Sequence, residues 1–193
     1  MMTMKLDENI NYIVSGLERS GTSMMMQILH AGDIPIASDD LRKSDENNPK
    51  GYYELEGGKI INKLMEKTFP IEEYKGRFIK ITAFGLSFLP QGSYKIIYME
   101  RNIDEVLDSM ELMAKISDKT REETKESFKK LNEKIKNDIK YNDDIDVLFV
   151  NYNEMLEIPE ENVKRVCNFL NLHDAAVNVM VGVIDTHLYR QRR

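Results

Sequence analysis

The segment 16–23, GLERSGTS, combines glycines with hydroxyl and cationic side chains at a spacing suited to binding phosphate. Glycines allow a tight turn and let the backbone approach phosphate oxygens closely. An apolar run at 10–15 precedes the segment and a helical pattern follows it, so the free amides at the start of that helix would point at the anion. The candidate phosphate ligands are Arg19, Ser20, Gly21, Thr22 and Ser23.

The spacing of the two glycines is that of the Walker A loop, G-x-x-x-x-G-K-[ST], with one departure. Thr22 stands where that motif has its lysine. Because this lysine neutralises the β- and γ-phosphates in ATPases and kinases, its absence argues against a protein that cleaves ATP. A nucleotide kinase or NTPase remains an alternative, and it would need a magnesium-binding acid at a strand end, for which Glu100 is the candidate.

Arg101 and Ser109 form a second candidate anion site. Arg101 follows the apolar run 94–99, and Ser109 comes eight residues later, about two turns into the next helix. Because ligands bind at the carboxyl ends of parallel strands, we expect Arg101 at the same sheet edge as the 16–23 loop. Two anion sites on one edge suit a nucleotide with phosphates at both ends, such as a 3′,5′-bisphosphate.

Short apolar runs alternate with helical patterns along the chain. The runs predict strands at 10–15, 34–37, 77–81, 94–99 and 146–150. The helical patterns cover 22–30, 59–66, 104–116, 120–141, 160–170 and 175–183. Strands separated by helices indicate a parallel sheet covered on both faces. The sequence therefore predicts an α/β fold: a three-layer P-loop nucleotide-binding fold with a central, mostly parallel sheet of about five strands and helices on both faces.

Composition narrows the classes of protein to which the chain could belong. We expect residues 1–193 to form one domain, in which the charged segment 118–144 is either a helical arm or lid or a plain surface helix. The net charge of −6 argues against nucleic-acid binding. No apolar run reaches the ~20 residues that span a membrane, and the N-terminus lacks a signal-peptide pattern, which predicts a cytoplasmic location. Cys167 is the only cysteine, which excludes an intramolecular disulfide and a cysteine-rich metal site.

Taken together, the motifs resemble those of the cytosolic and Golgi sulfotransferases, which use 3′-phosphoadenosine 5′-phosphosulfate (PAPS). The run 19–24, RSGTSM, is similar to their 5′-phosphosulfate loop, and Arg101 with Ser109 matches their 3′-phosphate motif. Further similar segments are RFIKIT (77–82), LPQ (89–91), KIIYMERN (95–102) and, as in small bacterial members, NPKGYYE (48–54). The resemblance covers most of residues 10–110 and implies PAPS as the cosubstrate.

The resemblance also implies catalytic residues, with one departure that changes the choice of base. Lys80 falls on the family's lysine, which contacts the transferring sulfuryl group or the bridging oxygen. The catalytic histidine of cytosolic members is Thr82 here, and a hydroxyl is a poor general base. Many Golgi-type relatives use a glutamate after the second strand, which makes Glu54 the candidate base. The next candidates are Asp39 and Asp40.

The remaining expectations concern the ends of the nucleotide and the acceptor. Arg19 is expected to act in catalysis as well as in binding, and Arg190, in a basic tail, could replace the family's missing C-terminal nucleotide motif. Tyr52 and Tyr53 could stack on the adenine or the acceptor. Sulfuryl transfer would need no metal, because the transferred group carries less negative charge than a phosphoryl group. The acceptor is a hydroxyl or amine on a carbohydrate, lipid, peptide or phenol, and a nucleotide-binding protein without catalysis is a further alternative.

Overall fold

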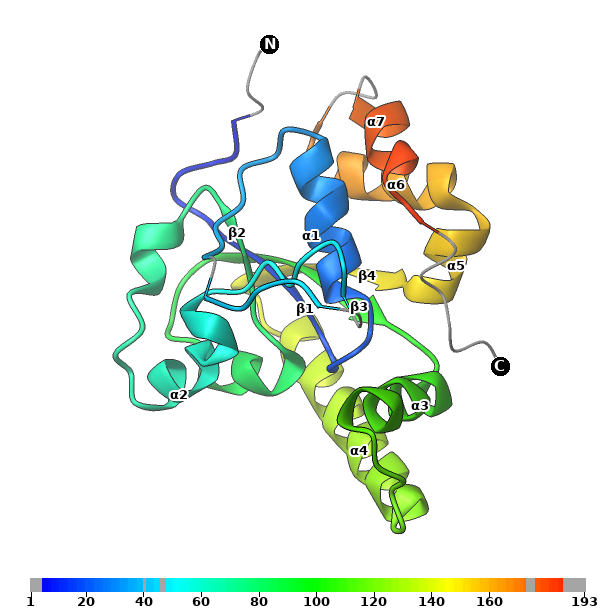
Figure 1. The fold of residues 1–193 in the computed structure, drawn as a ribbon. Coiled ribbons are helices and arrows are strands. Elements are labelled where there is room, and N and C mark those ends of the chain that lie inside the picture. The colour runs from blue at the N-terminus through cyan, green and yellow to red at the C-terminus, as the bar shows by residue number, and fades with distance from the viewer. Residues whose placement is uncertain (1–4, 40, 46–47, 173–175, 186–193) are drawn as a thin grey trace.

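The computed structural model describes residues 5–39, 41–45, 48–172 and 176–185. Within them, one parallel sheet has the strand order β2-β1-β3-β4 (Figure 1). The strands are β1 (Asn11–Gly16), β2 (Phe78–Lys80), β3 (Tyr94–Glu100) and β4 (Ile145–Asn151). Since β1 has β2 on one side and β3 on the other, the strand order reverses beside β1. Open α/β sheets bind ligands at the carboxyl ends of the strands at such a reversal.

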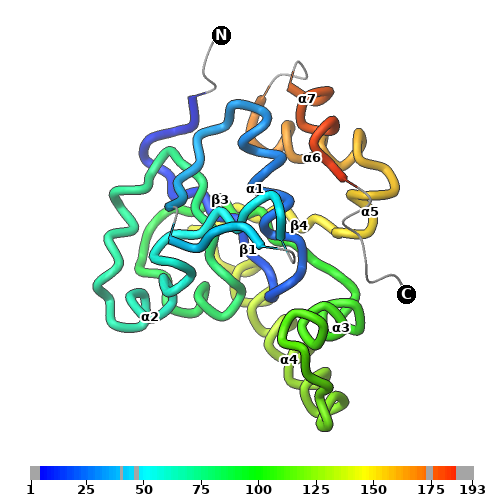
Figure 2. The backbone as a smooth tube through the Cα atoms, viewed as in Figure 1, coloured from blue at the N-terminus to red at the C-terminus, as the bar shows by residue number. Residues whose placement is uncertain are grey.

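Helices surround the sheet on both faces (Figures 1 and 2). The α-helices are α1 (Thr22–Ala31), α2 (Ile60–Met65), α3 (Ile103–Ala114), α4 (Arg121–Lys140), α5 (Tyr152–Glu157), α6 (Pro159–Phe169) and α7 (Val177–Gly182). Three short 3₁₀ helices complete the described elements: η1 (Glu56–Gly58), η2 (Ile71–Tyr74) and η3 (Ala83–Phe88).

Alternate residues of the central strands enter two separate apolar clusters. Val14 and Ile97 join the cluster that α1, α6 and α7 cover, whereas their neighbours Ile13 and Ile96 join the cluster that α2, η3 and α4 cover. Successive side chains of a strand point to opposite faces, so both faces of β1 and β3 must be apolar to be buried. The predicted three-layer α/β architecture with a parallel sheet is therefore confirmed.

The prediction of a strand at 34–37 is wrong, and the described sheet has four strands rather than about five. In place of a strand, Ile36 forms an isolated parallel bridge to Phe78. The backbone oxygen of Pro35 accepts a hydrogen bond from Phe78 N at 2.9 Å, and Ala37 N donates to Phe78 O at 2.8 Å. Proline has no backbone N–H to donate, so the run is too short and too interrupted to extend a ladder.

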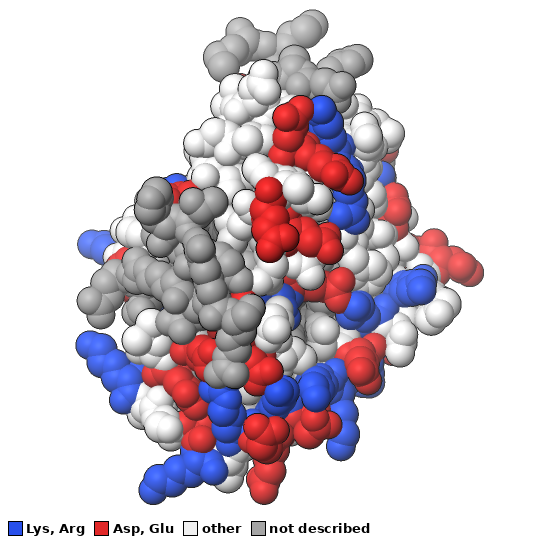
Figure 3. All heavy atoms as spheres, turned by 90° about the vertical axis from the view of Figure 1, so that its right-hand side faces the viewer, with Lys and Arg blue, Asp and Glu red and all other residues white. Residues whose placement is uncertain are grey.

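The charged segment 118–144 contains α4, which packs against α3. Arg121 donates to Asp108 at 2.7 Å, and Lys125 lies 2.8 Å from Asp104, which ties the start of α4 to α3. The other end of α4 buries Ile135 and Ile139 under the sheet. Figure 3 shows charges of both signs mixed on this part of the surface. No helix among the described residues has the length and apolar character needed to cross a membrane.

The two-sided core predicts the effect of a single cavity. Ile97 is fully buried in the middle of β3, so Ile97→Ala should lower the free energy of unfolding by about 2–5 kcal/mol. Val179 in α7 is 57% exposed, and Val179→Ala should change it by less than about 1 kcal/mol. Urea denaturation of the two variants checks the difference; equal losses would contradict the described core.

Candidate active site

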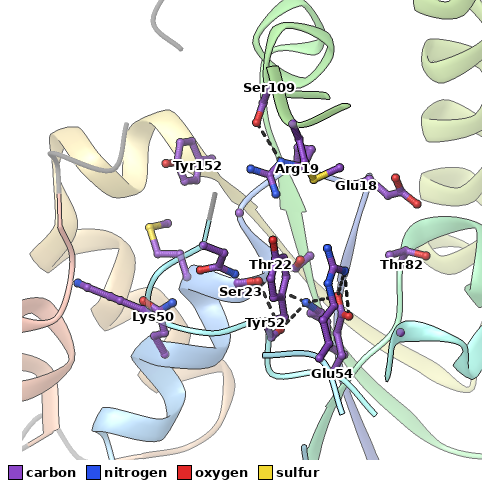
Figure 4. A pocket seen from close by; sticks show the side chains of 18 of the residues that line it. Glu18, Arg19, Thr22, Ser23, Lys50, Tyr52, Glu54, Thr82, Ser109 and Tyr152 are labelled. Carbon is purple, nitrogen blue, oxygen red and sulfur yellow. Dashed lines mark hydrogen bonds and ion pairs between the residues drawn. The ribbon is translucent and has the colours of Figure 1, made fainter. Parts of the chain in front are cut away.

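A cavity of about 310 Å³ opens at the carboxyl ends of β1 and β3, where the strand order reverses (Figure 4). The loop after β1 and the first turn of α1 form one wall, the segment 48–58 forms a second, and residues of α3 form a third. Eight of the residues proposed from the sequence line it: Arg19, Gly21, Thr22, Ser23, Glu54, Lys80, Arg101 and Ser109.

Two glycines give the loop between β1 and α1 a shape that other residues would not fit. Gly16 has a φ of +147°, and a Cβ there would lie 2.4 Å from the backbone oxygen of Met99 in β3. Gly21 precedes α1 with a φ of +100°, and a Cβ there would lie 2.4 Å from the ring of Tyr152. Glycine at both positions therefore lets the loop pack closely between β3 and α5 while its backbone faces the cavity.

The hydroxyl groups of the loop suit an anion. Ser20 is 1% exposed, and its Oγ has no hydrogen-bond partner among the residues that the structure describes. Thr22 and Ser23 begin α1 and line the cavity. Ser20 is not among the residues that line the cavity, and its Oγ lies beside Gly16. Thr22 and Ser23 are the hydroxyl side chains that would donate to a phosphate oxygen at the helix start. The loop therefore fits the 5′-phosphate end of the nucleotide that the sequence predicts.

The residues of the two predicted anion sites are in direct contact. Arg19 Nε donates to Ser109 Oγ at 2.9 Å, across 90 positions of sequence. Arg101 Nη1 donates to the backbone oxygen of Arg19 at 3.0 Å. The structure thus places the 16–23 loop and the Arg101–Ser109 pair on one sheet edge. A ligand with phosphates at both ends would contact both sites from within the same cavity.

A buried ion pair fixes the direction of the Arg101 side chain. Arg101 Nε lies 2.9 Å from Glu105 Oε2, with side-chain exposures of 8% and 0%. Asn153 Nδ2 donates to Glu105 Oε1 at 3.1 Å, and the Arg101 guanidinium carbon lies 4.5 Å from the centre of the Tyr152 ring. Because Glu105 is buried and is itself held by Asn153 of α5, its ion pair orients the Arg101 guanidinium before any ligand binds.

Lys80 and Glu54, the predicted catalytic lysine and base, form an ion pair in the cavity wall. Lys80 Nζ lies 2.9 Å from Glu54 Oε1, donates to the backbone oxygen of Tyr52, and lies 3.3 Å from Ser23 Oγ. Figure 4 shows Ser23, Tyr52 and Glu54 together on this side of the site. Burial lowers the pKa of Lys80, and the charge of Glu54 opposes that shift.

The alternative bases and the remaining candidates lie elsewhere. Asp39 accepts hydrogen bonds from the backbone nitrogens of Leu41 and Glu56 and lies outside the residues that line the cavity, so it braces the loop. Thr82 and Tyr52 line the cavity. Two further candidates, Asp40 and Arg190, lie outside the described residues. Tyr53 packs against the cluster on the α1 face and near the His30 ring.

Among the cavity residues that sequence reasoning missed, Arg42 and Tyr152 contact predicted site residues. Tyr152 directly follows β4, so the rule that strand ends form the site could have identified it. Arg42 lies in a polar segment without regular structure, and nothing in its spacing indicates a role. Its Nη1 lies 3.1 Å from Glu54 Oε2.

The acid proposed for a magnesium-binding kinase is engaged elsewhere. Glu100 pairs with Lys136 of α4 and lies outside the residues that line the cavity. Among the described residues, no three His, Cys, Asp or Glu side chains are placed to hold a metal ion together. The geometry around the phosphate loop therefore gives the kinase alternative no support.

Comparisons with known proteins agree with this site. A family model described as "Sulfotransferase domain" matches residues 9–184. The sulfotransferase domain of the Synechococcus PCC 7002 olefin synthase has a similar structure, with a TM-score of 0.55, 16% identity, and coverage of 95% of this chain and 83% of that chain. Mouse sulfotransferase SULT7A1, complexed with PAP, has a TM-score of 0.54, 16% identity, and coverage of 97% and 67%.

At such identities the two structures show likeness of fold, whereas the family model covers most of the sequence. No curated protein sequence matches this chain. Three features of the sequence resemble those of PAPS-dependent enzymes. They are the Walker-like loop without its lysine, the arginine and serine of the second anion site, and the lysine at the end of β2. The chain belongs to the sulfotransferase domain family.

Proposed function

We propose that this protein transfers the sulfuryl group of PAPS to a hydroxyl or amine acceptor, with Lys80 and Glu54 as catalytic residues. The observation that carries the proposal is the Lys80–Glu54 contact beside the phosphate loop, because it places a cation and a carboxylate in one cavity with the donor site. Membership of the sulfotransferase family supports PAPS as the donor.

The donor would lie across the carboxyl ends of the strands. The amides and hydroxyls of segment 19–23 would bind its 5′-phosphosulfate, with Arg19 adding positive charge. Arg101 and Ser109 would bind its 3′-phosphate. This assignment is supported by the contact between Arg19 and Ser109, since it brings the two ends of the site within reach of one small ligand.

Transfer requires an acceptor oxygen or nitrogen to attack sulfur in line with the leaving group. A bond forms between that atom and sulfur while the bond between sulfur and the 5′-phosphate oxygen breaks, which releases PAP and the sulfated acceptor. Lys80 would neutralise the charge that develops on the phosphate oxygen. Glu54 would take the proton from the acceptor. In the free protein Glu54 Oε1 faces Lys80, so the base and the leaving-group cation are already adjacent.

Arg101 should affect the binding of the 3′-phosphate and not the rest of the nucleotide. Arg101→Lys keeps a cation beside Glu105 but loses the guanidinium, so affinity for PAP should fall about 10- to 100-fold. Affinity for AMP, which lacks the 3′-phosphate, should change less than about threefold. Calorimetric titration of both nucleotides measures the two effects. Equal losses for PAP and AMP, or none, would remove Arg101 from the 3′-phosphate site.

A pH dependence of PAP binding follows from the burial of Lys80. Burial lowers its pKa below the usual lysine value, against the charge of Glu54. Only the protonated amine pairs with a phosphate oxygen, so affinity is complete below that pKa and is lost as the pH rises through it. The loss should therefore begin at a lower pH than an exposed lysine would give.

Titration with PAP from about pH 7 to about pH 10 checks this alkaline loss. Burial raises the pKa of the neighbouring Tyr52, and, against the opposing effect of burial, the charge of Glu54 raises the pKa of Arg42, so neither side chain adds a titration step within this range. Lys80→Arg stays protonated and should bind PAP with no alkaline loss. An alkaline loss of the same size in Lys80→Arg would show that another group titrates.

Catalysis, as opposed to nucleotide binding alone, depends on the Glu54 carboxylate. Glu54→Gln keeps the shape of the side chain but cannot accept a proton, so sulfate transfer from PAPS should fall about 10²- to 10⁴-fold. PAP affinity should not fall more than about threefold, because the change removes the carboxylate that Lys80 would otherwise have to leave when the donor binds. Transfer is measured on a panel of phenol, sugar, lipid and peptide acceptors. Full transfer by Glu54→Gln would assign the base elsewhere, and PAP binding without transfer by the wild type would favour the non-catalytic alternative.

A further inference from the structure

Arg42 contacts both oxygens of the Glu54 carboxylate through one nitrogen. Its Nη1 lies 3.3 Å from Glu54 Oε1 and 3.1 Å from Glu54 Oε2. The guanidinium carbon lies 3.6 Å from the centre of the Tyr52 ring, so the flat group rests on an aromatic face. The side chain is thus held from two sides, by the carboxylate that it contacts and by the ring beneath it.

The two cations around Glu54 differ in position and in burial. Lys80 approaches Oε1 from the side of the phosphate loop and has a side-chain exposure of 5%. Arg42 approaches both oxygens and has a side-chain exposure of 39%. Glu54 lies between them with an exposure of 13%. Lys80 is therefore the cation next to the donor site, and Arg42 is the cation nearer to solvent.

The backbone beside the carboxylate leaves room for this arrangement. Gly58 has a φ of +86°, and a Cβ there would lie 2.7 Å from Glu54 Oε2 and 4.0 Å from Arg42 Nη1. Any larger residue would push the carboxylate away from the position where Arg42 contacts it. Gly58 thus supports the ion pair between Arg42 and Glu54, because it lets Glu54 pack against the η1 backbone.

Donor binding would take one of the two partners from Glu54. Lys80 would turn toward the 5′-phosphate oxygen that leaves sulfur, since its Nζ already lies 3.3 Å from Ser23 Oγ at the start of α1. A largely buried carboxylate that loses its only cation would be destabilised and would seek another partner. Glu54 would keep Arg42, which contacts both oxygens, so the carboxylate would remain paired and in the same position.

We propose that Arg42 is a positioning residue, which holds the Glu54 carboxylate at the sulfuryl position after Lys80 has moved to the donor. The inference rests on the proposed function, because it requires Glu54 to accept the proton. Arg42 acts through Glu54 and needs no contact with the donor. Its loss should therefore slow sulfuryl transfer without weakening donor binding.

The experiment compares Arg42→Met with a matched control, Arg77→Met. Arg77 is an exposed arginine whose guanidinium carbon lies 5.6 Å from the Tyr74 ring, away from the residues that line the cavity. Transfer is followed as sulfate released from radiolabelled PAPS, with water as the acceptor, so that no particular acceptor is assumed. PAP affinity is measured by calorimetry on the same preparations.

We expect Arg42→Met to lower the rate of sulfate release about 10- to 100-fold, because a displaced base loses its alignment. PAP affinity should stay within about threefold, and Arg77→Met should change neither quantity. Arg42→Lys should recover most of the rate, since one nitrogen of Arg42 makes both contacts and an ammonium can replace it. A merely structural role for Arg42 would lower PAP affinity and the melting temperature together.

Three outcomes would overturn the inference while the proposed function stands. A tenfold or larger loss of PAP affinity in Arg42→Met would make Arg42 a ligand of the donor. Unchanged sulfate release in Arg42→Met, with normal PAP binding, would remove its role in positioning while the proposed function stands. In a crystal structure with PAP, Lys80 should contact the 5′-phosphate while Arg42 still contacts Glu54, and an Arg42 bonded to the nucleotide would contradict this. Failure of the wild type to bind PAP would instead refute the proposed function and the inference with it.

Discussion

The buried ammonium of Lys80 is the constraint on which the arrangement of the site depends. It lies at the end of β2 with a side-chain exposure of 5%, and removing an unpaired charge from water costs several kcal/mol (~3–5 when a partner is deleted). Its partners, the backbone oxygen of Tyr52 and the carboxylate of Glu54, come from a segment with little regular structure. The requirement to pair Lys80 therefore holds that segment against the sheet edge, where it becomes a wall of the cavity (Figure 4).

A second buried ion pair lies at the end of β3, on the other side of the phosphate loop. β2 ends at Lys80, β1 ends at the loop, and β3 ends next to Arg101, whose guanidinium pairs with the fully buried Glu105. The three neighbouring strands β2, β1 and β3 thus end at a cation (Lys80), at the phosphate loop and at a second cation (Arg101). A ligand with one anionic group at each end would match this row, which explains why a parallel sheet with its reversal beside β1 suits a bisphosphorylated nucleotide.

The sequence predicts the positions of those site residues that directly follow a strand. Arg101 and the 16–23 loop each follow an apolar run, so the rule for parallel sheets predicts that they lie on one edge. Lys80 lies within the predicted strand 77–81, and only the family resemblance identifies it as a site residue. The segment 34–37 also reads as a strand, yet the missing N–H of Pro35 reduces it to one bridge. The ion pair of Lys80 with Glu54 and the role of Asp39 as a loop brace were beyond prediction, because irregular segments carry no periodicity from which to place side chains. Arg42 is hidden for the same reason.

A pair that stabilises the free protein has a consequence for the reaction. Lys80 pairs with Glu54 in the free protein, so under the proposed function donor binding would exchange one ion pair for another at the same ammonium. Part of the donor's binding energy would then be used to separate the proposed base from the proposed leaving-group cation. Arg42 contacts Glu54 on the solvent side before the donor binds and would keep that contact afterwards. A contact that is equal in both states shifts no equilibrium, so Arg42 would affect transfer and leave donor affinity unchanged.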